Sequence, residues 1–160
     1  MTDLRIDPAT PQDTPLLLRL IQALAEYERM TDECVTTEAN LREALFGARP
    51  VADAAIARLG GEPVGYALWF YNYSTFLGLP GLYLEDLFVL PEERGKGVGK
   101  ALLAYLARVA VSRGCRRVEW VVLDWNESAI RFYHSLGARP MDGWTIYRLT
   151  GDALTRLAEQ

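Results

Sequence analysis

The residues best suited to chemistry lie in a glycine-dense turn between an apolar strand and a helix. Gly95, Gly97 and Gly99 alternate with other residues, and glycine can adopt a positive φ and let a ligand approach the backbone. The free N–H groups of such a turn and the positive end of the following helix dipole favour an anion. Basic side chains at both ends of the turn add full charges. The predicted anion site consists of Arg94, Gly95, Lys96, Gly97, Val98, Gly99 and Lys100.

The spacing distinguishes this turn from other phosphate loops. A Walker loop requires Gly-x-x-x-x-Gly-Lys-Ser/Thr, but the position five before Gly99 is Arg94, and Lys100 is followed by Ala101. The dinucleotide fingerprint Gly-x-Gly-x-x-Gly is not matched by strictly alternating glycines either. Two interpretations of the turn remain. It is either a loop that binds a pyrophosphate group or, more simply, a basic turn on the surface.

Two adjacent carboxylates, Glu85 and Asp86, interrupt the apolar run Leu82–Val89 just before this turn. Burying an unpaired charge is expensive, so both need a partner or an open cleft. Because side chains alternate along a strand, we expect the two to point to opposite faces. One is then structural, bonded to backbone or to a basic partner, and the other faces a cleft. The alternative in which both are structural stays open.

A second acidic segment joins the first two predicted helices. It contains Tyr27 and Glu28, followed by Asp32 and Glu33. Such a run is either a solvated loop or the lip of a cation-binding cleft, and the sequence favours neither.

The hydrophobic pattern predicts one α/β domain that spans residues 1–160, with a mixed sheet. Thr10 and Asp13 form a predicted capping box with Pro11 at the first helical position. A right-handed crossover would make the strand after the glycine turn parallel to the one before it. We expect strands at 4–6, 54–59, 64–71, 82–89, 118–123 and 144–149, and helices at 11–28, 37–46, 101–113, 127–136 and 153–158.

The composition narrows the class of partner. A formal net charge of −4 argues against nucleic acid and makes a small cationic molecule more plausible. No leader and no run of about 20 apolar residues is present, so we expect a soluble, cytoplasmic protein without a membrane partner. His134 is the sole histidine, and Cys34 and Cys115 lie far apart. We therefore expect no metal site and two buried thiols.

The motif Arg94-x-x-Gly97-x-Gly99 after a Val-x-Pro strand end resembles the acyl-CoA pyrophosphate loop of the GNAT N-acetyltransferase family. The order of elements along the whole chain resembles the fold of that family. Several stretches are similar to its diamine (spermidine/spermine) and thialysine N-acetyltransferase branch. These are Leu82–Val89, Trp125-Asn126, Glu127–Tyr133, Leu136–Ala138, Pro8–Thr10 and Ala25–Glu28.

This resemblance implies acetyl-CoA as the co-substrate, a small cationic amine as the acceptor, and a homodimer. It places the pantetheine arm on the backbone of Leu87, Phe88 and Val89, the pyrophosphate on residues 94–100, and Asn126 against the CoA arm. It implies that Tyr133 protonates the departing thiolate. Glu85 would act as the base, directly or through water, and the acceptor would contact Tyr27, Glu28, Glu85 and Asp86.

These residue types suit the reaction. An alkylammonium with a pKa of about 10.4 must lose a proton before it attacks a thioester, and a carboxylate can accept that proton. The segment Tyr73–Gly78 lacks the aspartate and tryptophan of polyamine-specific relatives. Thialysine-like amino acids, other small amines and a peptide N-terminus therefore all remain as acceptors. A non-catalytic acetyl-CoA sensor or interaction module is the alternative from another class.

Overall fold

A computed structural model describes residues 3–160 of the chain. The contacts divide these residues into two compact units, one that ends at Val121 and one that comprises Val122–Gln160. The first unit holds the whole sheet, three long helices and the glycine turn. The second unit holds two further helices.

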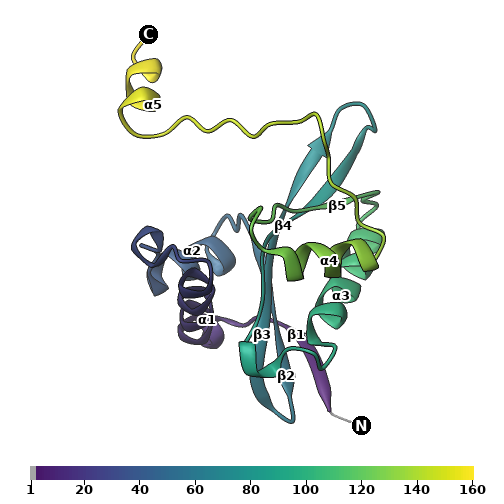
Figure 1. Cartoon of the computed structure of the whole chain (residues 1–160). Coiled ribbons are helices and arrows are strands. Elements are labelled where there is room, and N and C mark those ends of the chain that lie inside the picture. Colours follow the sequence, from purple (N-terminus) through teal and green to yellow (C-terminus); the bar gives the residue numbers. More distant parts are fainter. Residues whose placement is uncertain (1–2) are drawn as a thin grey trace. The chain divides into compact units, whose positions relative to one another are not determined.

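A five-stranded sheet in the order β1-β2-β3-β4-β5 forms the centre of the first unit (Figure 1). The first four strands pair antiparallel, and β5 pairs parallel with β4. The mixed sheet and the parallel fifth strand confirm the sequence-based expectation, but β5 is shorter than the expected 118–123. The strands are β1 Leu4–Pro8, β2 Asp53–Leu59, β3 Glu62–Ser74, β4 Leu79–Val89 and β5 Val118–Glu119.

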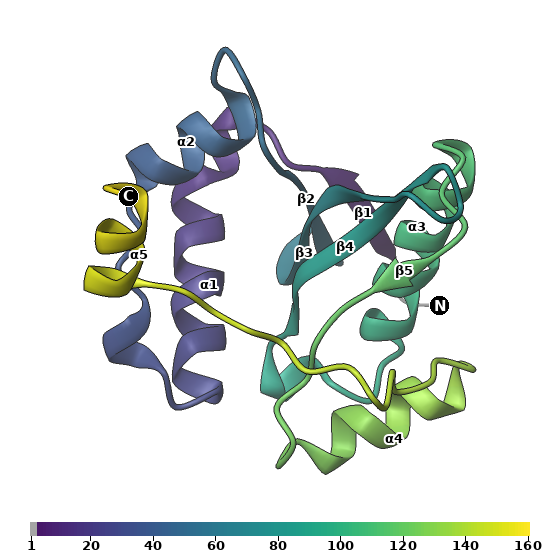
Figure 2. The ribbon, with the colours of Figure 1, turned by 90° about the horizontal axis from the view of Figure 1, so that it is seen from above.

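Helices cover both faces of this sheet (Figure 2). Helices α1 (Thr14–Tyr27) and α2 (Glu38–Phe46) lie on one face, and α3 (Val98–Ser112) lies on the other. On the α3 face, the rings of Trp69 and Tyr105 meet edge to face, 6.2 Å apart. The core on the α1/α2 face comprises Leu17, Leu20, Leu41, Leu45, Ala54, Ile56, Tyr66 and Phe88.

Capping residues set the start of the first two helices. The backbone N–H and the hydroxyl of Thr10 donate to the Asp13 carboxylate at 2.8 and 3.1 Å, which confirms the predicted capping box. The first turn, Pro11–Asp13, is 3-10 and leads directly into α1. At the next helix, the Thr37 hydroxyl accepts the N–H of Asn40 at 3.1 Å. Both caps satisfy amides that have no carbonyl partner within the helix.

A β-bulge interrupts the pairing of β3 with β4. Leu84 pairs with Trp69 and Asp86 pairs with Leu68, so Glu85 is an extra residue in β4. Leu84 thus shares the α3 face with Trp69, whereas Asp86 shares the other face with Leu68, which packs against the α1/α2 core. The strict alternation that predicted opposite faces for Glu85 and Asp86 therefore ends at this bulge.

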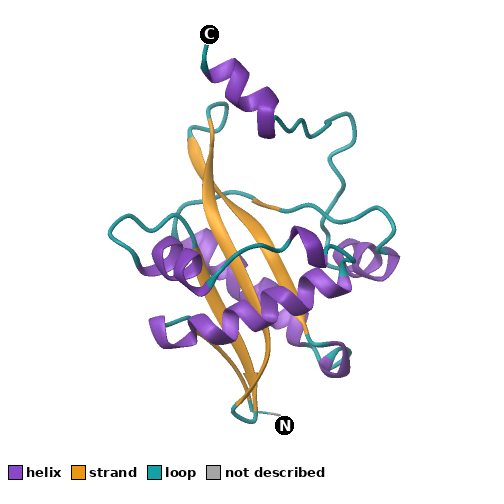
Figure 3. Ribbon diagram, turned by 90° about the vertical axis from the view of Figure 1, so that its left-hand side faces the viewer, coloured by secondary structure: helices purple, strands orange, loops and turns teal. Residues whose placement is uncertain are grey.

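The second unit contains α4 (Glu127–Ser135) and α5 (Gly151–Ala158). The expected strand at 144–149 is wrong, because these residues form no strand, and Figure 3 shows them as loop. Trp144, Ile146 and Tyr147 are 80%, 71% and 93% exposed. The alternating pattern supplies β propensity, but a strand also requires a neighbour for its backbone groups, and no described strand pairs with this segment.

Three features of the described residues bear on the expectations from composition. None of the helices in residues 3–160 is both long and apolar enough to cross a membrane. Cys115 is buried as expected, while Cys34 is only half-buried, and both are free thiols. Within the same residues, no cluster of His, Cys, Asp and Glu has the grouping of a metal site.

Candidate functional site

The glycine turn, residues 94–100, follows β4 through a short 3-10 helix and leads into α3. Gly95 and Gly97 have φ values of 77° and 83°, in the left-handed region that favours glycine, and Gly97 is the N-cap of α3. Gly99 lies in the first helical turn, so the expectation of a positive φ holds for two of the three glycines. A Cβ at Gly95 or Gly97 would meet no atom within 4 Å, which shows that the space above the turn is open.

The start of α3 presents amides to this open space. The Ala101 N–H donates to the Gly97 carbonyl at 3.0 Å and closes the first turn of the helix. The N–H groups of Val98, Gly99 and Lys100 precede that bond and have no carbonyl partner within the helix. They lie at the positive end of a 15-residue helix. This arrangement suits a phosphate-bearing ligand.

Two basic side chains of the turn already have partners within the chain. The Lys96 ammonium contacts the Glu93 carboxylate at 2.7 Å. The Arg94 Nε donates to the Val89 carbonyl at 3.0 Å, and the Arg94 Cζ lies 4.3 Å from the centroid of the Tyr27 ring. The sequence assigned Arg94 to the pyrophosphate and Tyr27 to the acceptor, and the structure brings these two residues into contact.

The edge of β4 next to β5 is largely without a strand partner. The two strands pair only at Leu82–Val118 and Tyr83–Glu119, so the ladder ends before the bulge. On its other edge, β4 stays paired with β3 as far as Val89. The backbone of residues 87–89 therefore borders an open edge among the described residues, and such an edge can pair with an extended ligand. The side chain of Phe88 is buried in the α1/α2 core.

Three carboxyl groups, here called the acidic cluster, come together from two elements. Glu28 caps the C-terminus of α1, Glu85 is the bulge residue of β4, and Asp86 follows it. The Tyr66 hydroxyl donates to the Asp86 carboxylate at 2.9 Å. The expected partner was backbone or a basic side chain, and the structure corrects this to a buried phenol. Tyr66 was missed because nothing in its own apolar run links it to a residue in another strand.

The electrostatics of the acidic cluster favour a cation. Burial is the main cause that raises the pKa of Asp86 to about 6; Glu85 and Glu28 add to the rise, and the Tyr66 hydrogen bond opposes it. Burial also raises the pKa of the Glu28 carboxyl. Because each ionised group disfavours ionisation of its neighbours, a cation bound among them would relieve that repulsion. Glu85 is exposed, whereas Glu28 and Asp86 are half-buried.

Two residues singled out from the sequence, Asn126 and Tyr133, belong to the second unit. Asn126 is the N-cap of α4, where its side chain accepts the Ala129 N–H at 3.4 Å. Tyr133 lies within α4, with its ring centroid 5.7 Å from that of Phe132. Their roles toward CoA stay predictions. Asp32 and Glu33 lie in the exposed 3-10 helix Thr31–Glu33.

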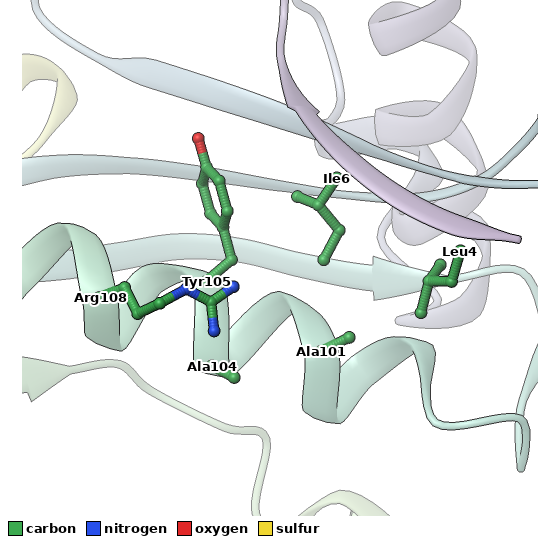
Figure 4. Close-up of a pocket in the computed structure, with 6 residues that line it drawn as sticks. All are labelled: Leu4, Ile6, Ala101, Ala104, Tyr105 and Arg108. Carbon is green, nitrogen blue, oxygen red and sulfur yellow. The ribbon is translucent and has the colours of Figure 1, made fainter.

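A cavity of about 380 Å³ lies elsewhere in the first unit, between β1 and α3 (Figure 4). Its walls are mostly apolar and contain none of the three carboxyl groups. It lies on the α3 face of the sheet, whereas Asp86 and Tyr66 lie on the opposite face. The lining residues are Leu4, Ile6, Ala101, Ala104, Tyr105 and Arg108. The candidate site is therefore the open region around the glycine turn, the β4 edge and the acidic cluster.

Comparison with known proteins identifies what this arrangement is. The sequence profile of the Acetyltransferase (GNAT) family matches residues 18–138, a range that includes the bulge, the β4 edge and the glycine turn. The chain belongs to the GNAT family. GNAT enzymes transfer acyl groups from acetyl-CoA, and membership confirms both the expected fold and the expected class of acetyl-CoA-dependent acyltransferase.

Relatives within the GNAT family match the chain over its whole length. It is 38% identical to a thialysine N-epsilon-acetyltransferase of Sus scrofa, with 99% of each chain covered. It is 35% identical to an L-ornithine N5-acetyltransferase of Arabidopsis thaliana, with 94% of this chain and 86% of the relative covered. An integron cassette protein of V. cholerae has a solved structure with a TM-score of 0.82, 26% identity and 98% coverage of both chains. The full-length match to the thialysine acetyltransferase confirms the resemblance to that branch.

The raised pKa of Asp86 predicts a specific pH dependence of stability. With a folded pKa of about 6 against an ordinary value of 3.8, wild-type stability falls as the pH rises from about 4 through 6, because Asp86 must ionise inside the fold. Asp86→Asn removes this charge and keeps an oxygen for Tyr66. Relative to wild type, the free energy of unfolding of Asp86→Asn should increase by up to about 3 kcal/mol between about pH 4 and pH 8, as measured by urea unfolding. If the free energies of unfolding of wild type and Asp86→Asn changed in parallel with pH, the raised pKa of Asp86 would be contradicted. Asp142→Asn, at an exposed aspartate, is the control.

The glycine turn predicts how acetyl-CoA binding responds to an added carboxylate. Gly97→Asp forces a side chain into a left-handed position and puts a negative charge at the start of α3, so acetyl-CoA affinity should fall by about 100-fold or more. Calorimetry measures the affinity. Gly61→Asp is the matched control, because Gly61 has a similar φ of 89° in the β2–β3 turn. A folded Gly97→Asp protein with wild-type affinity would exclude this turn as the pyrophosphate site.

Proposed function

We propose that this GNAT enzyme transfers the acetyl group of acetyl-CoA to a primary amine of a small cationic acceptor, a diamine, a polyamine or a thialysine-like amino acid. The observation that carries this proposal is the acidic cluster of Glu28, Glu85 and Asp86, which lies next to the glycine turn through the contact of Tyr27 with Arg94. The names of the relatives, thialysine and ornithine acetyltransferases, support an acceptor of this kind.

The proposed reaction uses the residues as follows. The glycine turn holds the pyrophosphate, the backbone of residues 87–89 pairs with the pantetheine arm, and Asn126 contacts the CoA arm. The free amine attacks the thioester carbonyl, a C–N bond forms and the C–S bond breaks. Glu85 accepts the proton that the ammonium loses before attack, directly or through water, and Tyr133 gives a proton to the thiolate. The second proton, which the nitrogen loses as the amide forms, returns through solvent to the Tyr133 oxygen. Backbone N–H groups near Val89 stabilise the developing oxyanion.

An acceptor panel tests this function. The enzyme is supplied with acetyl-CoA and, in turn, thialysine, L-ornithine, spermidine, butylamine and a short acidic peptide, while free thiol and product mass are measured. We expect turnover with the acceptors that carry a second cationic group, and much less with butylamine or the peptide. Equal turnover of all amines would leave a GNAT enzyme without the proposed selectivity. If the protein bound acetyl-CoA but released no thiol with any acceptor, the alternative of a non-catalytic acetyl-CoA sensor or interaction module would replace the proposed function.

Glu28 gives a prediction about acceptor binding. Glu28→Gln removes a charge that the ammonium group feels in the ground state and in the transition state alike, so it should raise KM for cationic acceptors about tenfold or more. The value of kcat should change much less. Glu26→Gln, an exposed carboxylate on the same helix, is the control. An unchanged KM for every accepted amine would remove Glu28 from the acceptor site.

Tyr133 gives a prediction about the chemical step. Tyr133→Phe removes only the hydroxyl, so it should lower kcat by about 100-fold and leave acetyl-CoA affinity nearly intact. Steady-state kinetics and calorimetry measure the two effects separately. Tyr147→Phe, at a 93% exposed tyrosine, is the control. A near-wild-type kcat would assign the protonation of the thiolate to another group.

We further infer that residues 1–160 form a single domain, and that the protein is cytoplasmic, forms a homodimer and has neither a nucleic-acid nor a membrane partner. The net charge of −4 supports the exclusion of nucleic acid. The exposed apolar side chains of Trp144, Ile146 and Tyr147 support self-association, because a second copy would remove them from water. Light scattering of the purified protein decides between monomer and dimer.

A further inference from the structure

We propose that the stack of Arg94 on Tyr27 couples the two substrate sites, so that coenzyme A in the glycine turn and a cationic amine at the acidic cluster strengthen each other's binding. This inference rests on the proposed function and assigns Arg94 and Tyr27 a positioning role within it. Arg94 lies at the start of the turn, and Tyr27 ends α1 immediately before Glu28.

The guanidinium of Arg94 is held on more than one side. Its Cζ lies 4.3 Å from the Tyr27 ring centroid and 5.6 Å from that of Phe88, and the two rings are 6.2 Å apart. Its Nε donates to the Val89 carbonyl at 3.0 Å, which uses one of the five N–H groups of the side chain. The terminal nitrogens are the groups with which Arg94 can contact an anion in the turn. The same side chain can thus contact a phosphate, the β4 edge and α1.

The backbone after Tyr27 transmits this contact to the acidic cluster. The chain leaves α1 through a tight turn in which Met30 N–H donates to the Ala25 carbonyl at 2.8 Å and Arg29 N–H to the Glu26 carbonyl at 3.1 Å. Arg29 has a φ of 61°, a conformation that leaves little freedom to a residue with a side chain. Glu28 lies between Tyr27 and this turn along the chain, so a contact that holds Tyr27 in place also restricts the backbone that carries the Glu28 carboxylate.

The coupling follows from these two links. Arg94 is exposed, so without a ligand its stack on Tyr27 competes with solvation of the guanidinium. An anion in the turn engages the remaining N–H groups, holds the guanidinium on the ring and orders the end of α1 with Glu28. A cation at Glu28 orders the same segment from the other side. Because the coupling free energy is reciprocal, each ligand raises the affinity of the other by the same factor.

Direct attraction between the phosphates and the ammonium group would also give positive coupling, and substitutions separate the two origins. Direct attraction does not require an aromatic ring at position 27 and survives Tyr27→Leu. Coupling through the stack survives Tyr27→Phe, which keeps the ring, and disappears in Tyr27→Leu. It also disappears in Arg94→Lys, because an ammonium group keeps the charge and loses the planar stacking surface.

The experiment measures the dissociation constant of coenzyme A by calorimetry, with and without saturating acceptor. Coenzyme A is the product, so no turnover occurs, and the acceptor is thialysine or L-ornithine, whichever the panel turns over faster. We expect the amine to tighten coenzyme A binding about fivefold or more in wild type and in Tyr27→Phe, and less than about twofold in Tyr27→Leu and Arg94→Lys. Reversing the order of titration must give the same factor.

A second arginine–tyrosine stack provides the matched control. The Arg113 Cζ lies 5.3 Å from the Tyr71 ring centroid at the other end of α3, so Tyr71→Leu should keep the wild-type coupling factor. Thermal unfolding verifies that each variant is folded. No coupling in wild type, or wild-type coupling in Tyr27→Leu, overturns this inference and leaves the transferase intact. Failure of wild type to bind coenzyme A or to release thiol instead overturns the proposed function.

Discussion

The extra residue in β4 is the constraint on which the arrangement of the first unit depends. Before Glu85 the even-numbered side chains of β4 pack toward α3, and after it Asp86 and Phe88 pack toward α1 and α2. A regular strand would have placed Asp86 on the α3 side, away from Tyr66 and Glu28. The bulge thus brings a carboxylate to a buried phenol and lies where the ladder to β5 has ended. The same local irregularity supplies the acidic cluster and borders the open edge of the strand.

Opposite electrostatic requirements meet within a short length of chain. The turn after β4 combines left-handed glycines, helix amides and basic side chains, all of which favour an anion. The bulge within β4 and the end of α1 gather carboxylates, which favour a cation. A transfer reaction between a polyanionic donor and a cationic acceptor requires both environments side by side. The contact of Arg94 with Tyr27 is where the two environments adjoin.

The acidic cluster is unfavourable for folding in the absence of a ligand. The elevated pKa of Asp86 reflects burial first and the neighbouring carboxylates second, and the Tyr66 hydrogen bond only partly compensates. Such clusters of perturbed carboxyls are typical of functional sites, because a group that destabilises the empty fold is available to stabilise a bound cation. The deep core of Leu17, Ile56 and Tyr66 beneath the cluster supplies the packing that tolerates this repulsion.

The sequence by itself determined the features that depend on neighbouring residues. The cap at Thr10, the start of the second helix near Thr37 and the glycine turn before α3 follow from local conformational preferences, and the spacing of the glycine turn was enough to suggest the family. Only the tertiary structure decided the bulge at Glu85, the pairing of Asp86 with Tyr66 and the stack of Arg94 on Tyr27. It also showed that residues 144–149 form no strand. Each of these depends on a partner distant in sequence, and a local pattern carries propensity and periodicity but not the identity of the residue across the sheet.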